Sequence, residues 1–251
     1  MRVRLLLGAI SAAALSASSA LAAPVIFFGE DVNLAGDPSQ PPPTQSNAAR
    51  ASLFAHLAGV GTQSFEGFPT GEEAILEAPF PGAGTATVFG GMVNGGENIA
   101  GRYPTSGEKY LNAYSPISMQ FSSPIAAFGF YATDVGDFDG KLTLQLTALS
   151  GEVVSLAVPA SVGIDGSTTG SVLFFGFYDL EKTYTSIFFE NGDYADIFGL
   201  DDFSIASAEQ LVASPVPEPA AWALMTMCFG VLGSAIRRRR PPQRLTRRPA
   251  A

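Results

Sequence analysis

Short runs of β-branched and aromatic residues follow one another from about Thr62 onward, and they constrain the fold more than any other feature. Eight runs are usually separated by Gly, Pro, Asp or Asn: Thr85–Val93, Ile117–Phe121, Ile125–Thr133, Lys141–Leu149, Glu152–Val158, Ser171–Tyr178, Tyr184–Glu190 and Phe198–Ala206. In 141–148 apolar and polar residues alternate, which predicts a strand with one buried face. Eight to ten short strands predict a mainly β fold, an antiparallel, jelly-roll-like β-sandwich.

One short N-terminal helix is expected ahead of these strands. Apolar residues recur at four-residue spacing between Thr44 and Ala58, and Gly59 follows them as a stop signal. The apolar run Pro24–Phe28 predicts a strand. Glu30–Pro43 is rich in turn residues and ends in three prolines, so it is expected to be a loop.

The C-terminal end combines a proline-rich motif, an apolar segment and a basic cluster. Pro215–Pro219 contains a Pro-Glu-Pro triplet, and Ala220–Ile236 is a run of 17 residues without a charge, followed by four arginines. Seventeen residues are at the lower limit for a helix that crosses a hydrocarbon core of about 30 Å. Arginines after such a segment tend to stay in the cytoplasm. The pattern predicts a single C-terminal transmembrane helix; the plainer alternative is an anchor that is never processed.

This order of features resembles the PEP-CTERM sorting tail of exported bacterial proteins. The resemblance implies that an exosortase-type membrane peptidase is a partner of the chain. It also implies anchoring in the inner membrane before processing, and then a location at the cell surface or in the extracellular matrix. The residues that carry it are the sorting motif Val216, Pro217, Glu218 and Pro219 and the membrane stop Arg237, Arg238, Arg239 and Arg240.

The N-terminal segment has the three parts of a secretory signal. Arg2 and Arg4 form a basic start, Leu5–Leu15 is apolar, and Ala20–Ala22 supplies a cleavage site of small residues. The expected organisation is therefore a signal peptide over 1–23, an exported β-sandwich domain over 24–212 and a sorting tail over 213–251.

The exported part is strongly acidic. Between residues 24 and 216 there are 22 acidic and five basic residues, so its net charge is near −17. Such a surface repels nucleic acid and favours divalent cations. The exported part also lacks cysteine and has His56 as its one histidine, which excludes disulfides and a multi-histidine zinc site.

Four motifs in the middle of the chain resemble those of galactose-binding-like and lectin-like β-sandwiches. They are Phe65-Glu66, Ala127-Phe128-Gly129-Phe130, Phe174-Phe175-Gly176-Phe177 and Phe198-Gly199-Leu200-Asp201-Asp202-Phe203. We expect a non-catalytic surface or matrix protein with affinity for glycan, such as an exopolysaccharide. No individual ligand-binding residue follows from the sequence. Tyrosines at strand ends or in loops are candidates for sugar stacking: Tyr103, Tyr110, Tyr114, Tyr178 and Tyr194.

The alternative function is a secreted carbohydrate-active hydrolase. Such an enzyme needs two carboxyl groups about 5–10 Å apart across the sugar. The candidates are Glu66, Glu72, Glu73 and Glu77, but the sequence does not identify a pair among them. No nucleophile elbow, P-loop or zinc-protease helix is present, so no catalytic residue is assigned.

A structural calcium ion is the expected cofactor. Strand alternation places Asp201 on the same face as Phe203 and Ile205, and a carboxylate that faces a core must be paired or neutralised. Basic partners are scarce, and calcium binds oxygen ligands. With Asp202 beside Asp201, the resemblance to lectin-like sandwiches adds Glu66 as the second ligand. The second choice is Asp134, Asp137 and Asp139 before Gly140; the alternative is that Asp201 caps a turn in water.

Overall fold

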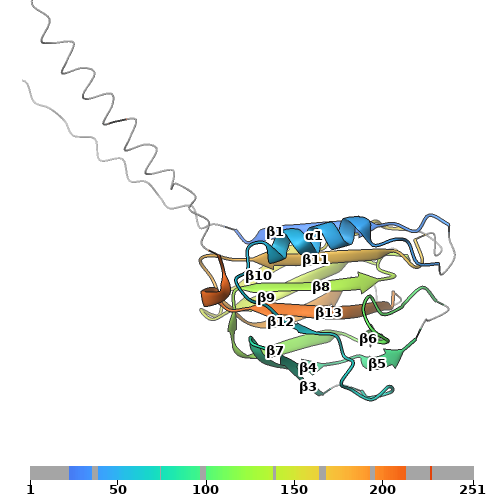
Figure 1. Cartoon of the computed structure of the whole chain (residues 1–251), viewed down its shortest axis with the longest axis horizontal. Coiled ribbons are helices and arrows are strands. Elements are labelled where there is room, and N and C mark those ends of the chain that lie inside the picture. The colour runs from blue at the N-terminus through green and yellow to red at the C-terminus, as the bar shows by residue number, and fades with distance from the viewer. Residues whose placement is uncertain are drawn as a thin grey trace, which may run out of the picture. The chain divides into compact units, whose positions relative to one another are not determined.

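The computed structural model describes residues 23–212 except 36–38, 74, 97–99, 138–139, 164–167 and 193–195, and also Met227. The chain divides into two units, residues 1–212 and 213–251, and every element below belongs to the first (Figure 1). The expected signal peptide, except Ala23, and the expected transmembrane helix, except Met227, therefore lie outside the described residues. Within the described part, no helix is both long and apolar enough to span a bilayer.

The described residues form one α-helix, one 3-10 helix and short β-strands. In chain order they are β1 (Val25–Asp31), α1 (Thr44–Phe54), β2 (Gly61–Gln63), β3 (Leu76–Phe80), β4 (Gly84–Phe89), β5 (Met92–Gly95), β6 (Lys109–Ala113), β7 (Ile117–Ile125), β8 (Ala127–Thr133), β9 (Leu142–Ala148), β10 (Val153–Ala157), β11 (Val172–Tyr178), β12 (Tyr184–Asn191), β13 (Phe198–Ala206) and η1 (Ala208–Gln210).

The strands make two antiparallel sheets. The first sheet has the order β1-β11-β8-β13-β6-β5, with β2 pairing to a second segment of β13; the second has the order β10-β9-β12-β7-β4-β3. The expected mainly β fold with two antiparallel sheets and one helix is confirmed.

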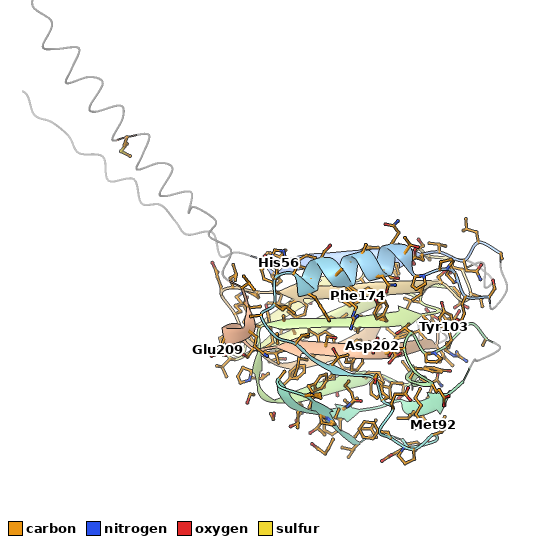
Figure 2. All side chains as sticks on the ribbon, in the orientation of Figure 1. His56, Met92, Tyr103, Phe174, Asp202 and Glu209 are labelled. Atoms are coloured by element: carbon orange, nitrogen blue, oxygen red, sulfur yellow. The ribbon has the colours of Figure 1, made fainter. Side chains whose placement is uncertain are left out.

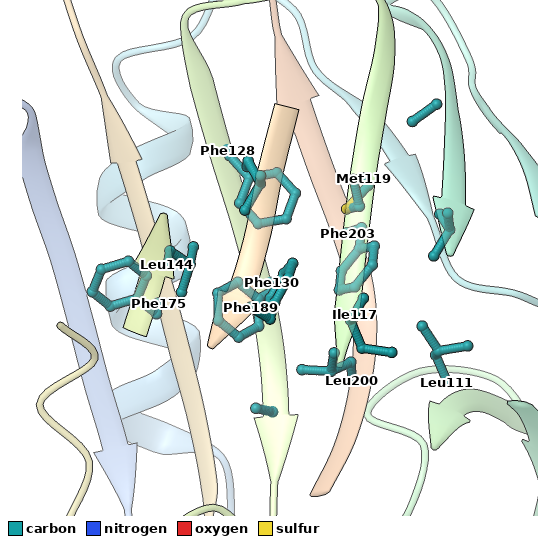
Figure 3. Close-up of a cluster of buried hydrophobic side chains, with 14 of the residues drawn as sticks. Leu111, Ile117, Met119, Phe128, Phe130, Leu144, Phe175, Phe189, Leu200 and Phe203 are labelled. Atoms are coloured by element: carbon teal, nitrogen blue, oxygen red, sulfur yellow. The ribbon is translucent and has the colours of Figure 1, made fainter. Parts of the chain in front are cut away.

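Phenylalanines fill the space between the two sheets. Phe128, Phe130, Phe189 and Phe203 are at most 1% exposed, and their rings meet edge-on or stacked, with 5.3 Å between the centroids of Phe130 and Phe189 (Figure 3). Leu142, Leu144 and Leu146 of β9 face the same core, as the alternation predicted. Burial of this apolar surface is the main force that holds the sheets together.

Helix α1 packs closely on the outer face of the first sheet, over β1 and β11 (Figure 1). A Cβ atom at Gly29 of β1 would lie 2.1 Å from the Gln45 carbonyl oxygen, and one at Gly176 of β11 would lie 2.7 Å from Leu53 Cδ2. Glycine at these strand positions therefore lets the helix approach the sheet. The Asp31 carboxylate accepts hydrogen bonds from the backbone N–H groups of Gln45 and Ser46 and so caps the helix.

Several boundaries differ from those expected. The predicted strand Thr85–Val93 is two strands, β4 and β5, which belong to different sheets because Gly90 and Gly91 both have positive φ between them. Helix α1 ends at Phe54 instead of Ala58, and β1 continues to Asp31, into the expected loop. Strands β2, β3 and β6 were not among the predicted runs.

Candidate functional site

Strand β13 changes its partner halfway along its length. Phe198–Leu200 pair with β6, Phe203–Ile205 pair with β2, and the register against β8 shifts between Asp201 and Ser204. Asp202 has φ +49°, in the left-handed region, so the strand bulges here. The bulge breaks the expected alternation: Phe198, Leu200, Phe203 and Ile205 belong to the core between the sheets, and Asp201 does not share their face. The predicted orientation of Asp201 is therefore wrong.

Asp201 is nevertheless buried, and the loop before β6 supplies its partners. Its Oδ2 atom accepts hydrogen bonds from the backbone N–H groups of Thr105 (2.8 Å) and Ser106 (3.0 Å) and from the Thr105 hydroxyl (3.0 Å). Its Oδ1 atom accepts the Asp202 N–H at 2.7 Å. Burial and the neighbouring Asp202 charge raise the pKa of Asp201 to about 7, against the lowering effect of these donors.

The other two expected ligands of the first calcium site contact the same loop. Asp202, labelled in Figure 2, lies on β13. Its Oδ1 atom accepts a hydrogen bond from the Ser106 hydroxyl at 2.7 Å. Glu66 Oε1 accepts the backbone N–H groups of Glu108 (2.8 Å) and Lys109 (2.7 Å). Asp201 thus has four hydrogen-bond donors where a lack of partners was expected. Calcium at Glu66, Asp201 and Asp202 stays a prediction.

The second-choice residues lie at the end of the sandwich, where β8 leads into β9. Asp134 is 2% exposed, and its Oδ1 accepts the Gly170 N–H at 3.0 Å. Asp137 is 3% exposed, and its Oδ2 accepts the Thr169 hydroxyl at 3.1 Å. Asp139 lies outside the described residues. Across the described part of the chain, no three His, Cys, Asp or Glu side chains are arranged as a metal-binding group.

Asp196, which sequence reasoning missed, joins Asp134 and Asp137. It is 2% exposed, and its Oδ2 accepts the Gly136 N–H at 2.8 Å. Burial raises the pKa of Asp134 to about 7, and burial and contact with Asp137 raise the pKa of Asp196, while Arg102 lowers both. Asp134 and Asp196 are 62 residues apart in the sequence. Asp196 lies two residues before β13, and β13 pairs with β8. The sequence would have predicted their proximity only if this strand pairing had been known.

An open cleft lies beside the loop that holds Asp201. Its volume is about 590 Å³, and its lining residues are Gln40, Thr70, Gly95, Gly96, Pro104, Gly107, Glu108 and Lys109. A smaller cavity of about 130 Å³ shares Gln40 and Pro104 with it and is lined further by Pro41, Pro43, Asn47, Tyr103, Thr105, Tyr131 and Val172. The cleft has the size of a small-ligand site and offers hydrogen-bonding groups of both kinds.

The residues proposed for sugar stacking and for hydrolysis are not gathered in this cleft. Tyr110 and Tyr178 are buried, Tyr114 is 44% exposed and donates to Glu73, and Tyr194 lies outside the described residues. Tyr103 reaches the smaller cavity, but its hydroxyl donates to the Gly170 carbonyl. Glu108 is the one carboxylate among the described residues that line the cleft, so no pair for glycoside hydrolysis is assigned there.

Comparison with known sequences identifies the tail. The description "PEP-CTERM protein-sorting motif" matches residues 215–240. The sorting motif inferred from Val216–Pro219 and the arginines is thereby confirmed as a sequence motif, although these residues lie outside the described structure. No curated protein matches the chain.

Three solved structures with a similar arrangement are each less than 20% identical to this chain. The K2 cleaved adhesin domain of Lys-gingipain is 16% identical, with 59% of this chain and 98% of that chain covered and a TM-score of 0.37. The CBM22-1 xylan-binding domain of Paenibacillus barcinonensis Xyn10C is 18% identical, with 63% and 97% covered and a TM-score of 0.36. The C-terminal family 22 carbohydrate-binding module of Clostridium thermocellum Xyn10B is 14% identical, with 60% of this chain and 95% of that chain covered and a TM-score of 0.35.

Proposed function

We propose that this chain is an exported, non-catalytic surface or matrix protein whose β-sandwich binds an uncharged polysaccharide. The PEP-CTERM motif indicates export, with processing at the C-terminus and anchoring before processing. The exopolysaccharide layer outside the cell is the ligand class that such a location offers.

The cleft beside the Asp201 loop is the observation that carries the glycan proposal. Gln40 and Thr70 contribute an amide and a hydroxyl group to the lining, beside three glycines, and such groups match sugar hydroxyls. The Lys109 ammonium group donates hydrogen bonds to the backbone carbonyls of Glu66 and Phe68. Its charge is therefore directed at these carbonyls and not at a ligand in the cleft. Together with the net charge near −17, this favours a neutral polymer over an anionic one.

Processing of the tail gives the first test. In the native bacterium, mass spectrometry of the cell-surface form should find no peptide from Ala223 onward, because the exosortase removes the segment after the Pro-Glu-Pro triplet. Replacement of Pro217 and Pro219 by Ala should leave the tail on the protein. Abundant surface protein that carries peptides from 237–248 would contradict processing.

Glycan binding gives the second test, on an array of neutral polysaccharides with alginate as the anionic comparison. The full chain should be retained by at least one neutral polymer, and Thr70→Trp, which fills the cleft from an exposed position, should weaken retention by about tenfold or more. Phe188→Ala is the matched control, since Phe188 is exposed on the outer face of the second sheet. Loss of binding in Phe188→Ala alone would move the site to that sheet, and no retention at all would refute glycan binding.

A further inference from the structure

Three buried carboxylates share one end of the sandwich with a single basic side chain. Asp134, Asp137 and Asp196 are each at least 97% buried, and Arg102 is the basic group that acts on Asp134 and Asp196. Arg102 Nη1 donates to the Ile197 carbonyl at 3.0 Å, so part of its donor capacity is already used. In the described ranges, the one salt bridge joins Lys182 and Glu152 elsewhere. The carboxylates therefore exceed their cationic partners, which is costly in a buried position.

One oxygen of this group has no hydrogen-bond donor. Asp196 Oδ2 is held by the Gly136 N–H, but Oδ1 is buried without a partner among the described residues. The Asp137 carboxyl lies within hydrogen-bonding reach of Asp196. Two ionised carboxylates at this distance repel each other, so the pair is stable only with a shared proton or with a cation between them.

The backbone is shaped around this pair. A Cβ atom at Gly140 would lie 1.8 Å from Asp196 Oδ2, and Gly136 has φ +88°. Glycine at both positions lets the backbone at 136 and at 140 approach the Asp196 carboxylate closely. Asp196 also borders a cavity of about 10 Å³ that Tyr114, Ser115 and Asn191 help to line, room for about one water molecule.

We propose that Asp137 and Asp196 hold a divalent cation, with calcium as the best chemical match. The two carboxylates supply oxygen ligands, water would supply further ones, and calcium accepts six to eight oxygens in irregular geometry. Magnesium requires a more regular octahedron and keeps more of its water. The Asp134 carboxylate accepts the Gly170 N–H and is not a ligand of the ion in this proposal. It contributes only negative charge near the site. The site is separate from the cleft and from the Asp201 bulge, and it does not depend on glycan binding.

Thermal unfolding of the full chain in detergent at pH 7.5 tests this site, with calcium chloride, magnesium chloride or EDTA. Calcium at 100 times its Kd should raise the Tm by about 5 °C or more relative to EDTA. Calorimetry should give one ion per chain. Asp196→Asn should remove the rise, since asparagine still accepts the Gly136 N–H but lacks the charge. Asp137→Asn should do the same and serves as the second variant if Asp196→Asn does not fold.

Asp202→Asn is the matched control, because it removes a buried carboxylate at the other candidate site. The calcium response should survive this substitution. A response that survives Asp196→Asn and Asp137→Asn but is lost in Asp202→Asn would place the ion at the β13 bulge and overturn the proposal. The absence of any calcium response would also overturn it, because a shared proton would then be sufficient to keep the Asp137–Asp196 pair together.

Discussion

Leu144→Asp should destabilise the sandwich domain by about 4–5 kcal/mol, a large part of the roughly 5–15 kcal/mol that stabilises a typical domain. Leu144 is fully buried on β9, an inner strand of the second sheet, opposite Leu156 of β10 and Phe189 of β12. Aspartate there loses the transfer free energy of the leucine side chain and adds a charge with no partner. Urea denaturation followed by circular dichroism should show the loss as a lower midpoint.

Thr147→Asp is the matched control on the same strand. Thr147 is only half buried, and its cross-strand neighbours are Val153 and Ser186, neither of which is acidic. We expect a change below about 1 kcal/mol for this surface position. Similar losses for Leu144→Asp and Thr147→Asp would mean that the two faces of β9 are assigned the wrong way round.

The strands that alternate regularly could be predicted from sequence because each has one buried face. In β9 the three leucines are buried and the residues between them are half buried, as the period of two requires. The same reasoning failed at Thr85–Val93, where two glycines with positive φ send the chain from one sheet to the other. Turn chemistry inside an apolar run is visible in the sequence, but the sheet that each half joins depends on long-range pairing.

The candidate sites were predictable as residue types and much less as geometry. A buried carboxylate was expected at Asp201, because alternation placed it beside Phe203 and Ile205 and basic partners were scarce; Asp134, Asp137 and Asp139 were expected only as the second choice of calcium ligands. The bulge at Asp202 was not predictable from alternation. It lies where the partner along one edge of β13 changes from β6 to β2, and this pairing is not visible in the sequence. The cleft was missed because its lining comes from Gln40, Thr70, Gly95 and Glu108, which only the folded chain brings together.

The free energy of unfolding should fall as the pH rises from about 4 to about 7, when measured in EDTA. The unfolded Asp201 has a pKa near 3.8, and burial with the charge of Asp202 raises the pKa in the folded state to about 7. A raised carboxyl pKa means that the folded state binds the proton more tightly, so its contribution to stability is complete below pH 4 and is lost by about pH 7. One group supplies at most about 1.4 kcal/mol per pH unit, or on the order of 3 kcal/mol across this range. The raised pKa of Asp134 and of Asp196 changes stability in the same direction.

Two substitutions separate the part of this slope that belongs to Asp201. Asp201→Asn should remove that part, whatever its effect on stability at a single pH. Asp202→Asn should reduce it, because the Asp201 carboxyl then loses the neighbouring charge that raises its pKa. Asparagine tolerates the positive φ at 202 and can still accept the Ser106 hydroxyl, so the bulge itself is preserved. Stability that stays level or rises between pH 5 and 7 in the unmodified chain would show that Asp201 is ionised when folded, and that its four donors outweigh the cost of its burial.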